Sequence, residues 1–259
     1  MQSSKINKKI LIGAIQKNIK MALEEDIGKV DLSAQLINPK LTVIAYVKSK
    51  ESALISGILW FNSTFHTLDP KIKIKWLIKE GQIVKKNQRL CEVYGNARSI
   101  LSGERVALNF LQTLSATSTA TYHYVKAISG LHAKIFDTRK TIPGLRIAQK
   151  YAVIIGGGNN QRIGLFDQIL IKENHIKSSN KMDDLFPLAL KYAKNKNIQI
   201  EVERLDQLKK ALGLGFKNIL LDNFDIKALK KAVLLNKGRA LLEASGNITL
   251  KNVKKIALT

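Results

Sequence analysis

The densest group of residues that could do chemistry lies between Asp137 and His175. This span combines cations, glycines and possible metal ligands in the order DTRKTIPGLRIAQKYAVIIGGGNNQRIGLFDQILIKENH. Two apolar runs, 134–136 and 168–171, have strand character and end in DTRK and KENH, so polar groups cluster where the strands should stop. In a barrel of alternating strands and helices, the carboxyl ends of the strands form the active face. The span therefore predicts an anion-binding site.

Cationic side chains are the first components of this predicted site. Arg139, Lys140, Arg162 and Lys172 stand near predicted strand ends, and Arg105 could add a further guanidinium from a preceding helix. A guanidinium presents a planar fork of donors that can hold a carboxylate through two bonds. Taken singly, an arginine is more often a surface or salt-bridge residue, so both interpretations stay open from these residues alone.

Two carboxylates occupy similar positions further along the chain. Glu201 and Asp222 stand at or near the ends of apolar runs, in IEVE and LLDN. On adjacent strand ends they could hold Mg²⁺, a hard cation that prefers oxygen ligands, or accept ribose hydroxyls. The alternative is that they form salt bridges with the surrounding lysines. Glu173, beside Lys172, is a weaker candidate of the same kind.

Other polar motifs receive more conservative interpretations. The triple glycine 156–158 could form an anion nest, but after a helix it more often makes a C-cap and tight turn, which we assign to it. Ser245, Gly246 and Asn247 follow the last predicted strand, where exposed amides would bind phosphate. His175 is interpreted as a hydrogen-bonded residue at a strand end. No His/Cys cluster suggests catalytic zinc, and no P-loop or nucleophile-elbow motif is present.

The elements that must position these residues follow from hydrophobic spacing. Near-helical spacing over 6–23 predicts an amphipathic helix, and short alternating segments over 41–93 predict an antiparallel sheet. A helical segment follows, with Ser102 as the expected N-cap ahead of 105–114. Strand-like runs at 134–136, 168–171, 198–202, 219–221 and 241–244 then alternate with helical segments, which predicts parallel strands.

Composition limits the class of protein without selecting a function. The formal net charge of +23 implies attraction to polyanions, including RNA, anionic membranes and small phosphorylated substrates. The lysines are spread along the chain without interleaved aromatic residues, so compositional drift is favoured and a nucleic-acid partner is not expected. Cys91 is the single cysteine and is expected to be a buried, inert thiol. With neither a signal segment nor a run of transmembrane length, we expect a cytoplasmic protein without a membrane partner.

The motifs together resemble a known family. The segments EDIG, GERVALNFLQTLSATSTAT, DTRKTIPGLR, KYAVIIGGG, LIKENHI, EVERL, LLDNF and LLEASGN occur in the order found in the quinolinate phosphoribosyltransferases, also called nicotinate-nucleotide pyrophosphorylases (carboxylating). The resemblance implies an α/β fold with an N-terminal α/β-sandwich domain, expected over 1–112, and an open α/β barrel, expected over 113–259. Family members continue through another strand, a glycine-containing phosphate loop and a helix, so the barrel is expected to be incomplete and truncated at its C-terminus.

The resemblance also implies roles for individual residues. Equivalents of Arg105, Arg139, Arg162 and Lys172 hold quinolinate, with Arg105 supplied by a neighbouring subunit, so a homodimer is expected. Gln161 stands where the family usually has histidine before Arg162. Thr138, Arg139 and Lys140 are expected to contact the phosphoribosyl donor, and Ser245, Gly246 and Asn247 its phosphate. Glu201 and Asp222 are expected to serve the donor and Mg²⁺, the expected cofactor, and with Lys140 they form the expected catalytic set.

The activity that the resemblance implies is a glycosyl transfer in NAD biosynthesis. Phosphoribosyl would pass from phosphoribosyl pyrophosphate to quinolinate, with decarboxylation, giving nicotinate mononucleotide, pyrophosphate and CO₂. Three alternatives stay open from the sequence: a decayed family member with weak or no activity, a basic polyanion-binding scaffold, and a paralogue acting on another pyridine or related acceptor.

Overall fold

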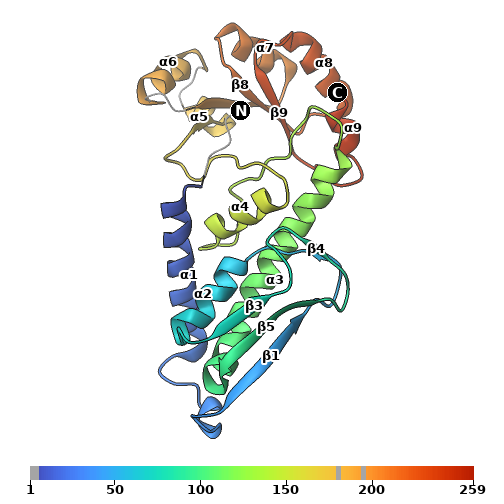
Figure 1. Cartoon of the computed structure of the whole chain (residues 1–259). Helices are drawn as coiled ribbons and strands as arrows, with labels where there is room; N and C mark the ends of the chain where they lie inside the picture. Colours follow the sequence, from blue (N-terminus) through green and yellow to red (C-terminus); the bar gives the residue numbers. More distant parts are fainter. Residues whose placement is uncertain (1–5, 179–181, 194–196) are drawn as a thin grey trace. The chain divides into compact units, whose positions relative to one another are not determined.

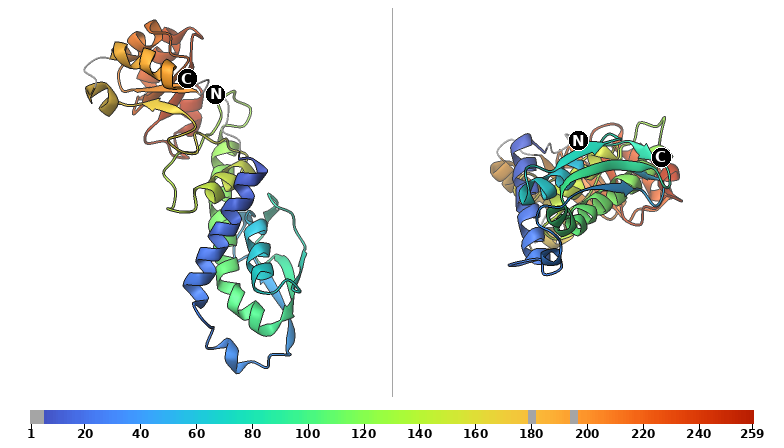
Figure 2. Two further views of the ribbon diagram at one scale, coloured as in Figure 1. Left: turned by 90° about the vertical axis from the view of Figure 1, so that its left-hand side faces the viewer. Right: turned by 60° about the horizontal axis from the view of Figure 1, so that its bottom comes forward.

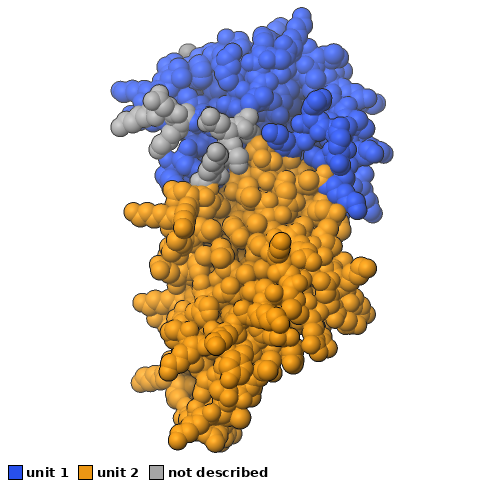
Figure 3. Space-filling view, in the orientation of Figure 1, with its two compact units in different colours: residues 1–4, 126–134, 161–259 blue, residues 5–125, 135–160 orange. Residues whose placement is uncertain are grey.

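The computed structural model describes residues 6–178, 182–193 and 197–259. The chain divides into two compact units, coloured separately in Figure 3. Within the described residues, unit 1 comprises Lys126–Lys134 and Gln161–Thr259, and unit 2 comprises residues 6–125 and Ile135–Asn160. The expected domain boundary after residue 112 lies inside the long helix α3 (Ala97–Ala127) and stays a prediction.

Unit 2 contains the antiparallel part of the fold. Its elements are α1 (Lys8–Ile27), η1 (Ala34–Leu36), β1 (Thr42–Lys48), β2 (Ala53–Leu54), α2 (Ile58–Leu68), β3 (Lys73–Trp76), β4 (Ile83–Val84), β5 (Arg89–Asn96), α3 and α4 (Arg146–Ile155). The strands form an antiparallel sheet in the order β1-β5-β3, and β2 pairs with β4 (Figure 1). The predicted antiparallel sheet is confirmed. Helix α2 was not predicted, because its many aromatic and β-branched residues are also typical of strands.

The helices of unit 2 pack through two apolar clusters. One cluster joins the sheet to α2 and the first half of α3, through residues such as Phe61, Val93 and Leu111. The other joins α1, α2, α3 and α4, through residues such as Ile19 and Trp60, and α1 lies beside α2 (Figure 1; Figure 2, left). The predicted N-terminal helix is confirmed. It begins at the cap Asn7, whose Oδ1 accepts from the Ile10 amide at 2.8 Å.

The start of α3 differs from the prediction. Ser102 lies inside the helix, which begins at Ala97, so it is not an N-cap. Its hydroxyl instead donates to Oδ2 of Asp31 at 2.7 Å. The expectation for Cys91 is confirmed, because the thiol is fully buried in the sheet and burial raises its pKa to about 12.

Unit 1 contains the parallel part of the fold. Its elements are β6 (Ile169–Ile171), α5 (Glu173–Ser178), α6 (Met182–Ala193), β7 (Ile198–Val202), α7 (Leu205–Gly213), β8 (Asn218–Asp222), α8 (Ile226–Asn236), β9 (Leu241–Ser245) and α9 (Val253–Ala257). The strands are parallel and lie in sequence order in one open four-stranded sheet. Four of the five predicted strands are therefore confirmed, and the α/β class with an open parallel unit is confirmed with them.

The two faces of the parallel sheet differ in polarity. Alternate residues such as Ile200, Ile219 and Leu221 are buried with the helices in one apolar cluster. Because side chains alternate between faces along a strand, Gln199, Glu201, Leu220, Asp222 and Glu243 share the opposite face. The candidate carboxylates Glu201 and Asp222 thus stand at the carboxyl ends of adjacent strands, on the same side of the sheet. Of the helices in the described part of the chain, none combines the length and apolar content that crossing a bilayer requires.

Candidate active site

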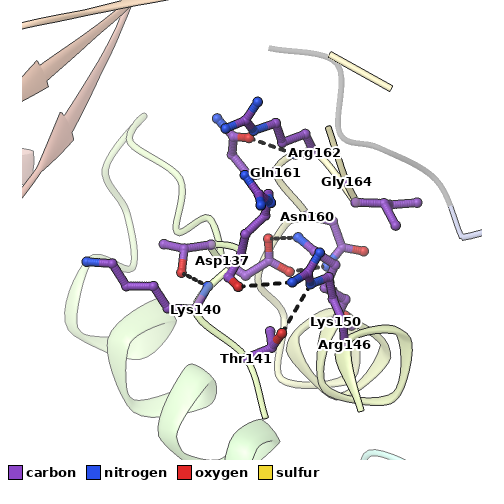
Figure 4. Close-up of polar contacts among 12 residues, drawn as sticks. Asp137, Lys140, Thr141, Arg146, Lys150, Asn160, Gln161, Arg162 and Gly164 are labelled. Carbon is purple, nitrogen blue, oxygen red and sulfur yellow. Dashed lines mark hydrogen bonds and ion pairs between the residues drawn. The ribbon is translucent and has the colours of Figure 1, made fainter. Parts of the chain in front are cut away.

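The DTRK segment lies in unit 2 and is anchored at its first residue. The predicted strand over 134–136 is wrong, since only an isolated parallel bridge between Phe136 and Asn159 forms there. The Asp137 amide donates to the Asn159 carbonyl at 3.0 Å, which fixes the backbone where the segment begins. The Asp137 carboxylate accepts from Lys150 Nζ at 2.5 Å and from Asn160 Nδ2 at 2.7 Å (Figure 4). Both ion-pair partners are buried, with side-chain exposures of 0% for Lys150 and 8% for Asp137.

Helix α4 carries the groups that hold this segment. Arg146 and Lys150 are one turn apart and therefore lie on the same face of the helix. Arg146 donates through Nε to the Thr141 hydroxyl at 3.1 Å and through Nη2 to the Arg139 carbonyl at 3.4 Å. Lys150 binds the beginning of the segment and Arg146 its middle and end, so one helix face fixes the whole run from Asp137 to Thr141 (Figure 4).

The predicted binding residues of unit 2 differ in their surroundings. The Lys140 amide donates to the Thr138 hydroxyl at 3.0 Å, so these two residues form a compact turn with exposed side chains. Arg139 is half-buried, and its Nε is buried with no hydrogen-bond partner in the described part of the chain. A buried guanidinium donor of this kind suits an incoming carboxylate. Arg105 is exposed on α3.

The triple glycine has the architectural role that was predicted. Gly156 caps α4, its amide donating to the Ala152 carbonyl at 2.9 Å, and Gly157 takes the left-handed φ of 85°. A Cβ on Gly156 would lie 2.5 Å from the Ser118 carbonyl oxygen, so only glycine lets the end of α4 approach α3 this closely.

In unit 1 the structure brings Lys172 and Glu201 together. Lys172 follows β6 and Glu201 lies on the neighbouring strand β7, with Nζ and Oε2 3.1 Å apart. The Lys172 side chain is 45% exposed, whereas Glu201 is 15% exposed. His175 is a hydrogen-bonded residue, as expected: its Nδ1 accepts from the Lys172 amide at 2.9 Å and so fixes the turn that carries the lysine.

The ends of β8 and β9 form a second polar group in unit 1. Asp222 is the register partner of Ser245, and the Asn223 amide donates to the Ser245 carbonyl at 2.9 Å. Gly246 has a φ of 91°, and a Cβ there would overlap the Asn223 side chain. The Asn247 Nδ2 donates to Asn223 Oδ1 at 3.4 Å. The turn over 245–247 is therefore packed directly against the turn that follows Asp222.

Gln161 and Arg162 begin a short loop that returns to β6. Asp167 closes this loop, accepting from the Ile163 amide at 2.7 Å and from the Gly164 amide at 3.0 Å. Both candidate residues are buried, with 9% exposure for Gln161 and 7% for Arg162. The Gln161 side chain bonds to protein groups: Nε2 donates to Gln199 Oε1 at 2.7 Å, and Oε1 accepts from the Arg162 amide at 2.7 Å.

Several residues of these arrangements were not among the predicted site residues. Lys150, Asn160, Gln199 and Glu243 all make short polar contacts beside predicted positions. The strand period could have identified two of them, because Gln199 and Glu243 stand two residues before Glu201 and Ser245 and share their face. Nothing in the sequence distinguishes Lys150 from the exposed lysines of other helices.

Family models match nearly the whole chain. The N-terminal domain of quinolinate phosphoribosyl transferase matches residues 31–115, and the C-terminal domain matches residues 117–259. The chain is 39% identical to the chloroplastic nicotinate-nucleotide pyrophosphorylase [carboxylating] of Arabidopsis thaliana, over 92% of this chain and 74% of that protein. It is 36% identical to the probable nicotinate-nucleotide pyrophosphorylase [carboxylating] of Bacillus subtilis, over 88% of this chain and 80% of that protein.

Solved structures agree with this assignment. The nicotinate-nucleotide pyrophosphorylase of Francisella tularensis superposes with a TM-score of 0.91 at 41% identity, covering 98% of this chain and 89% of that one. The corresponding protein of Ehrlichia chaffeensis gives a TM-score of 0.90 at 36% identity, covering 98% of this chain and 91% of that one. The chain therefore belongs to the quinolinate phosphoribosyltransferase family.

Proposed function

We propose that this protein transfers phosphoribosyl from phosphoribosyl pyrophosphate to the ring nitrogen of quinolinate, with loss of CO₂. The products are nicotinate mononucleotide and pyrophosphate, and the reaction serves NAD biosynthesis. The observation that carries this function is the match of both family domains, in order, over residues 31–259. The polar groups at the strand ends of unit 1 and in the DTRK segment of unit 2 supply suitable chemistry.

Quinolinate carries two carboxylates, so its binding requires cationic donors of defined orientation. We assign this role to Arg139, Arg162 and Lys172, together with Arg105 of the neighbouring subunit, and we assign Gln161 as a further contact. The Nε of Arg139, which has no partner in the part of the chain that the structure describes, supports its assignment, because a carboxylate oxygen would satisfy that buried donor. Arg162 is itself buried, and a charge-assisted bond made there is little screened by solvent.

We assign the donor and Mg²⁺ to the acidic strand ends. Glu201 and Asp222 face the same side of the sheet, and Lys172 lies 3.1 Å from Glu201. Carboxylate oxygens fit a hard cation. In the described residues, no group of three or more His, Cys, Asp or Glu side chains could hold a metal. Oxygens of the phosphoribosyl donor and water would therefore complete the coordination shell of the Mg²⁺. Bound Mg²⁺ supplies stabilisation of the negative charge on pyrophosphate. Ser245, Gly246 and Asn247 would hold a donor phosphate through the turn after β9.

The chemistry requires positioning rather than a covalent protein nucleophile. Cleavage at the anomeric carbon develops oxocarbenium character, as in glycoside hydrolysis. Lys140, with Thr138, stands on the exposed turn of the DTRK segment and would neutralise charge on the donor, while Arg139 and Arg162 align the pyridine nitrogen. After transfer, the positive ring nitrogen stabilises the carbanion left by decarboxylation, so the protein's task is to keep the correct carboxylate bound.

We further propose a homodimer in which Arg105 reaches the site of the neighbouring subunit. The exposed position of Arg105 on α3 supports this assignment, since the side chain is accessible to another chain. A cytoplasmic location is proposed as well, and subcellular fractionation with detection of the native protein would test it.

The decisive experiment follows nicotinate mononucleotide formation by purified protein supplied with quinolinate, phosphoribosyl pyrophosphate and Mg²⁺. We expect product with the wild-type protein and a large loss with Arg139→Ala. Folded wild-type protein that forms no product would contradict the proposed function and favour the decayed-member alternative. If another pyridine acceptor were turned over faster than quinolinate, that acceptor would be the substrate, in place of quinolinate.

The polyanion-binding alternative gains no support from where the lysines lie. Exposed lysines occur on α1 (Lys8, Lys9, Lys17), in β3 (Lys73, Lys75) and on α8 (Lys227, Lys230, Lys231), in both units. This scatter agrees with compositional drift rather than with one dedicated surface.

A further inference from the structure

A chain of buried amides links a carboxylate of the parallel sheet to Arg162. Glu243 on β9 accepts through Oε2 from Gln199 Nε2 at 2.8 Å. Gln199 on β7 accepts through Oε1 from Gln161 Nε2 at 2.7 Å, and Gln161 Oε1 accepts from the Arg162 amide at 2.7 Å. Gln168, at the other end of the loop, also donates to Gln199 Oε1, at 3.4 Å.

The three glutamines of this hydrogen-bonded series are buried, so the loss of a hydrogen bond among them would be costly. Gln199 is 0% exposed, and Gln161 and Gln168 are 9% and 8% exposed. A buried amide that loses its partner retains the full cost of desolvation, which water cannot offset. The contacts also join elements distant in sequence, since Gln161 and Glu243 are 82 residues apart.

The Glu243 carboxylate sets the donor-to-acceptor direction of the hydrogen bonds in this series. An ionised carboxylate accepts hydrogen bonds and cannot donate, so Gln199 must turn its NH₂ group toward Glu243. The Gln199 oxygen then faces Gln161 and accepts from the Gln161 NH₂ group. The Gln161 oxygen is thereby turned toward the Arg162 amide. The amide orientations therefore follow from Glu243, whose Oε2 also accepts directly from Gln161 Nε2 at 3.4 Å.

We propose that Glu243 and Gln199 are positioning residues for quinolinate binding, acting through Gln161 to fix the backbone of Arg162. This inference rests on the proposed function for its substrate. It also gives Gln161 a second role: besides any contact with the ligand, its oxygen sets the orientation of the residue that follows it. Arg162 itself remains the group that would touch quinolinate, and its Nη1 donates to the Gln168 carbonyl at 3.4 Å.

A swap of the two side-chain types tests the proposal. Gln199→Glu places a carboxylate against Glu243, and the repulsion should displace Gln161 and raise the quinolinate KM by about tenfold or more, with little change in the donor KM. Glu243→Gln removes the acceptor-only group and should raise the same KM less. In the double variant the carboxylate at position 199 accepts from Gln161 and Gln168, and the amide at 243 donates to it. We expect its quinolinate KM to return to within about threefold of the wild-type value.

Two controls separate positioning from general damage. Glu51→Gln makes the same change of charge as Glu243→Gln, but at an exposed site in unit 2. It should leave the KM values for quinolinate and for the phosphoribosyl donor unchanged. On an Arg162→Ala background, Gln199→Glu should add little to the quinolinate KM, because the proposed effect passes through Arg162. Thermal unfolding of each variant establishes that the protein compared is folded.

The outcomes distinguish this inference from the proposed function. Folded single variants with wild-type quinolinate KM values, or a double variant no better than Gln199→Glu, would overturn the positioning role while product formation by the wild type upheld the function. If the wild type gave no product, calorimetric binding of quinolinate to the same variants would decide the inference. Wild-type protein that neither turned over nor bound quinolinate would overturn both.

Discussion

At the scale of single residues, the candidate site divides into groups with different chemical tasks. Arg139 offers a buried guanidinium nitrogen that has no hydrogen-bond partner among the described residues, whereas Asp222 offers a carboxylate at the end of β8, bonded to Asn223 Nδ2 at 2.8 Å. The first suits an anionic acceptor and the second a cation or a ribose hydroxyl. Removal of each side chain should therefore affect a different substrate.

We expect Arg139→Ala to raise the quinolinate KM by about tenfold to a hundredfold, since one charge-assisted bond contributes roughly 1.5 to 3 kcal/mol. Asp222→Ala should chiefly raise the KM for phosphoribosyl pyrophosphate and the Mg²⁺ requirement. Initial rates measured with each substrate varied in turn would check this division. Equal effects of both substitutions on both substrates would contradict the role assignments.

Glu80 provides a residue-scale prediction about pH. Burial raises its pKa, although the carboxylate accepts from the amides of Gly57 and Ile58 at 2.7 and 3.0 Å. A raised pKa in the folded state means that Glu80 stabilises the fold most at low pH, below about pH 4, and that this contribution declines as pH rises through the raised pKa.

The free energy of unfolding of the wild type, minus that of Glu80→Gln, should accordingly fall between about pH 4 and pH 7, because glutamine stays neutral throughout. Urea unfolding at both pH values measures this difference. Glu51→Gln, which is exposed, should show a much smaller change with pH. A difference that grew with pH would mean that the two amide bonds outweigh the burial of the charge.

At the scale of elements, α4 is the support of the DTRK segment. Its buried Lys150 pairs with Asp137, and Arg146 on the same face bonds to Thr141. Removal of one partner leaves an uncompensated buried charge, which typically costs about 3 to 5 kcal/mol. The segment with Arg139 and Lys140 would lose its anchor at the same time.

Lys150→Met should therefore lower the free energy of unfolding by about 3 to 5 kcal/mol, and the double variant Lys150→Met with Asp137→Asn should recover part of that loss. Denaturant unfolding would give both values. As a matched control, Lys20→Met removes an exposed lysine that pairs with Glu24 at 3.8 Å and should change stability by less than about 0.5 kcal/mol. If Lys150→Met lowered the free energy of unfolding by equally little, the pair of Lys150 and Asp137 would not anchor the segment.

At the scale of the whole molecule, the proposed dimer makes each active site a product of two chains. If Arg105 comes from the neighbouring subunit, Arg105→Ala and Arg139→Ala place their defects in opposite chains of a mixed dimer. One of its two sites then carries both defects and the other carries none.

The two variants are mixed, dissociated and reassociated, then assayed at a quinolinate concentration at which each alone forms little product. Activity should return to as much as about a quarter of the wild-type value, because half of the dimers are mixed and each has one intact site. Product formation before and after mixing measures this recovery. As a control, Arg139→Ala is mixed with Arg162→Ala. Activity would be recovered in that mixture only if Arg139 and Arg162 served one site from different chains. No recovery with Arg105→Ala, in protein that is dimeric by light scattering, would place Arg105 in its own subunit's site.

Features that depend on neighbours along the chain could be predicted from the amino-acid sequence. Hydrophobic period located the first helix, the antiparallel segment and the strands β6 to β9, because alternation and helical spacing are local patterns. Polar residues at the ends of those strands made Lys172, Glu201 and Asp222 candidate site residues, since parallel strands bring their carboxyl ends to one edge. The order of the motifs was sufficient to identify the family.

Features that depend on contacts between distant segments could not be predicted in this way and are seen only in the folded chain. Ser102 has the residue type of a cap but lies inside α3, where it bonds to Asp31, and the run 134–136 has strand character but finds only one bridge partner. Lys150 looks like any helical lysine until packing buries it against Asp137. The link from Glu243 through Gln199 to Gln161 forms because the fold brings together residues of β9, of β7 and of the loop before β6. Burial and cross-strand proximity arise only when the chain is folded, so no local pattern could encode them.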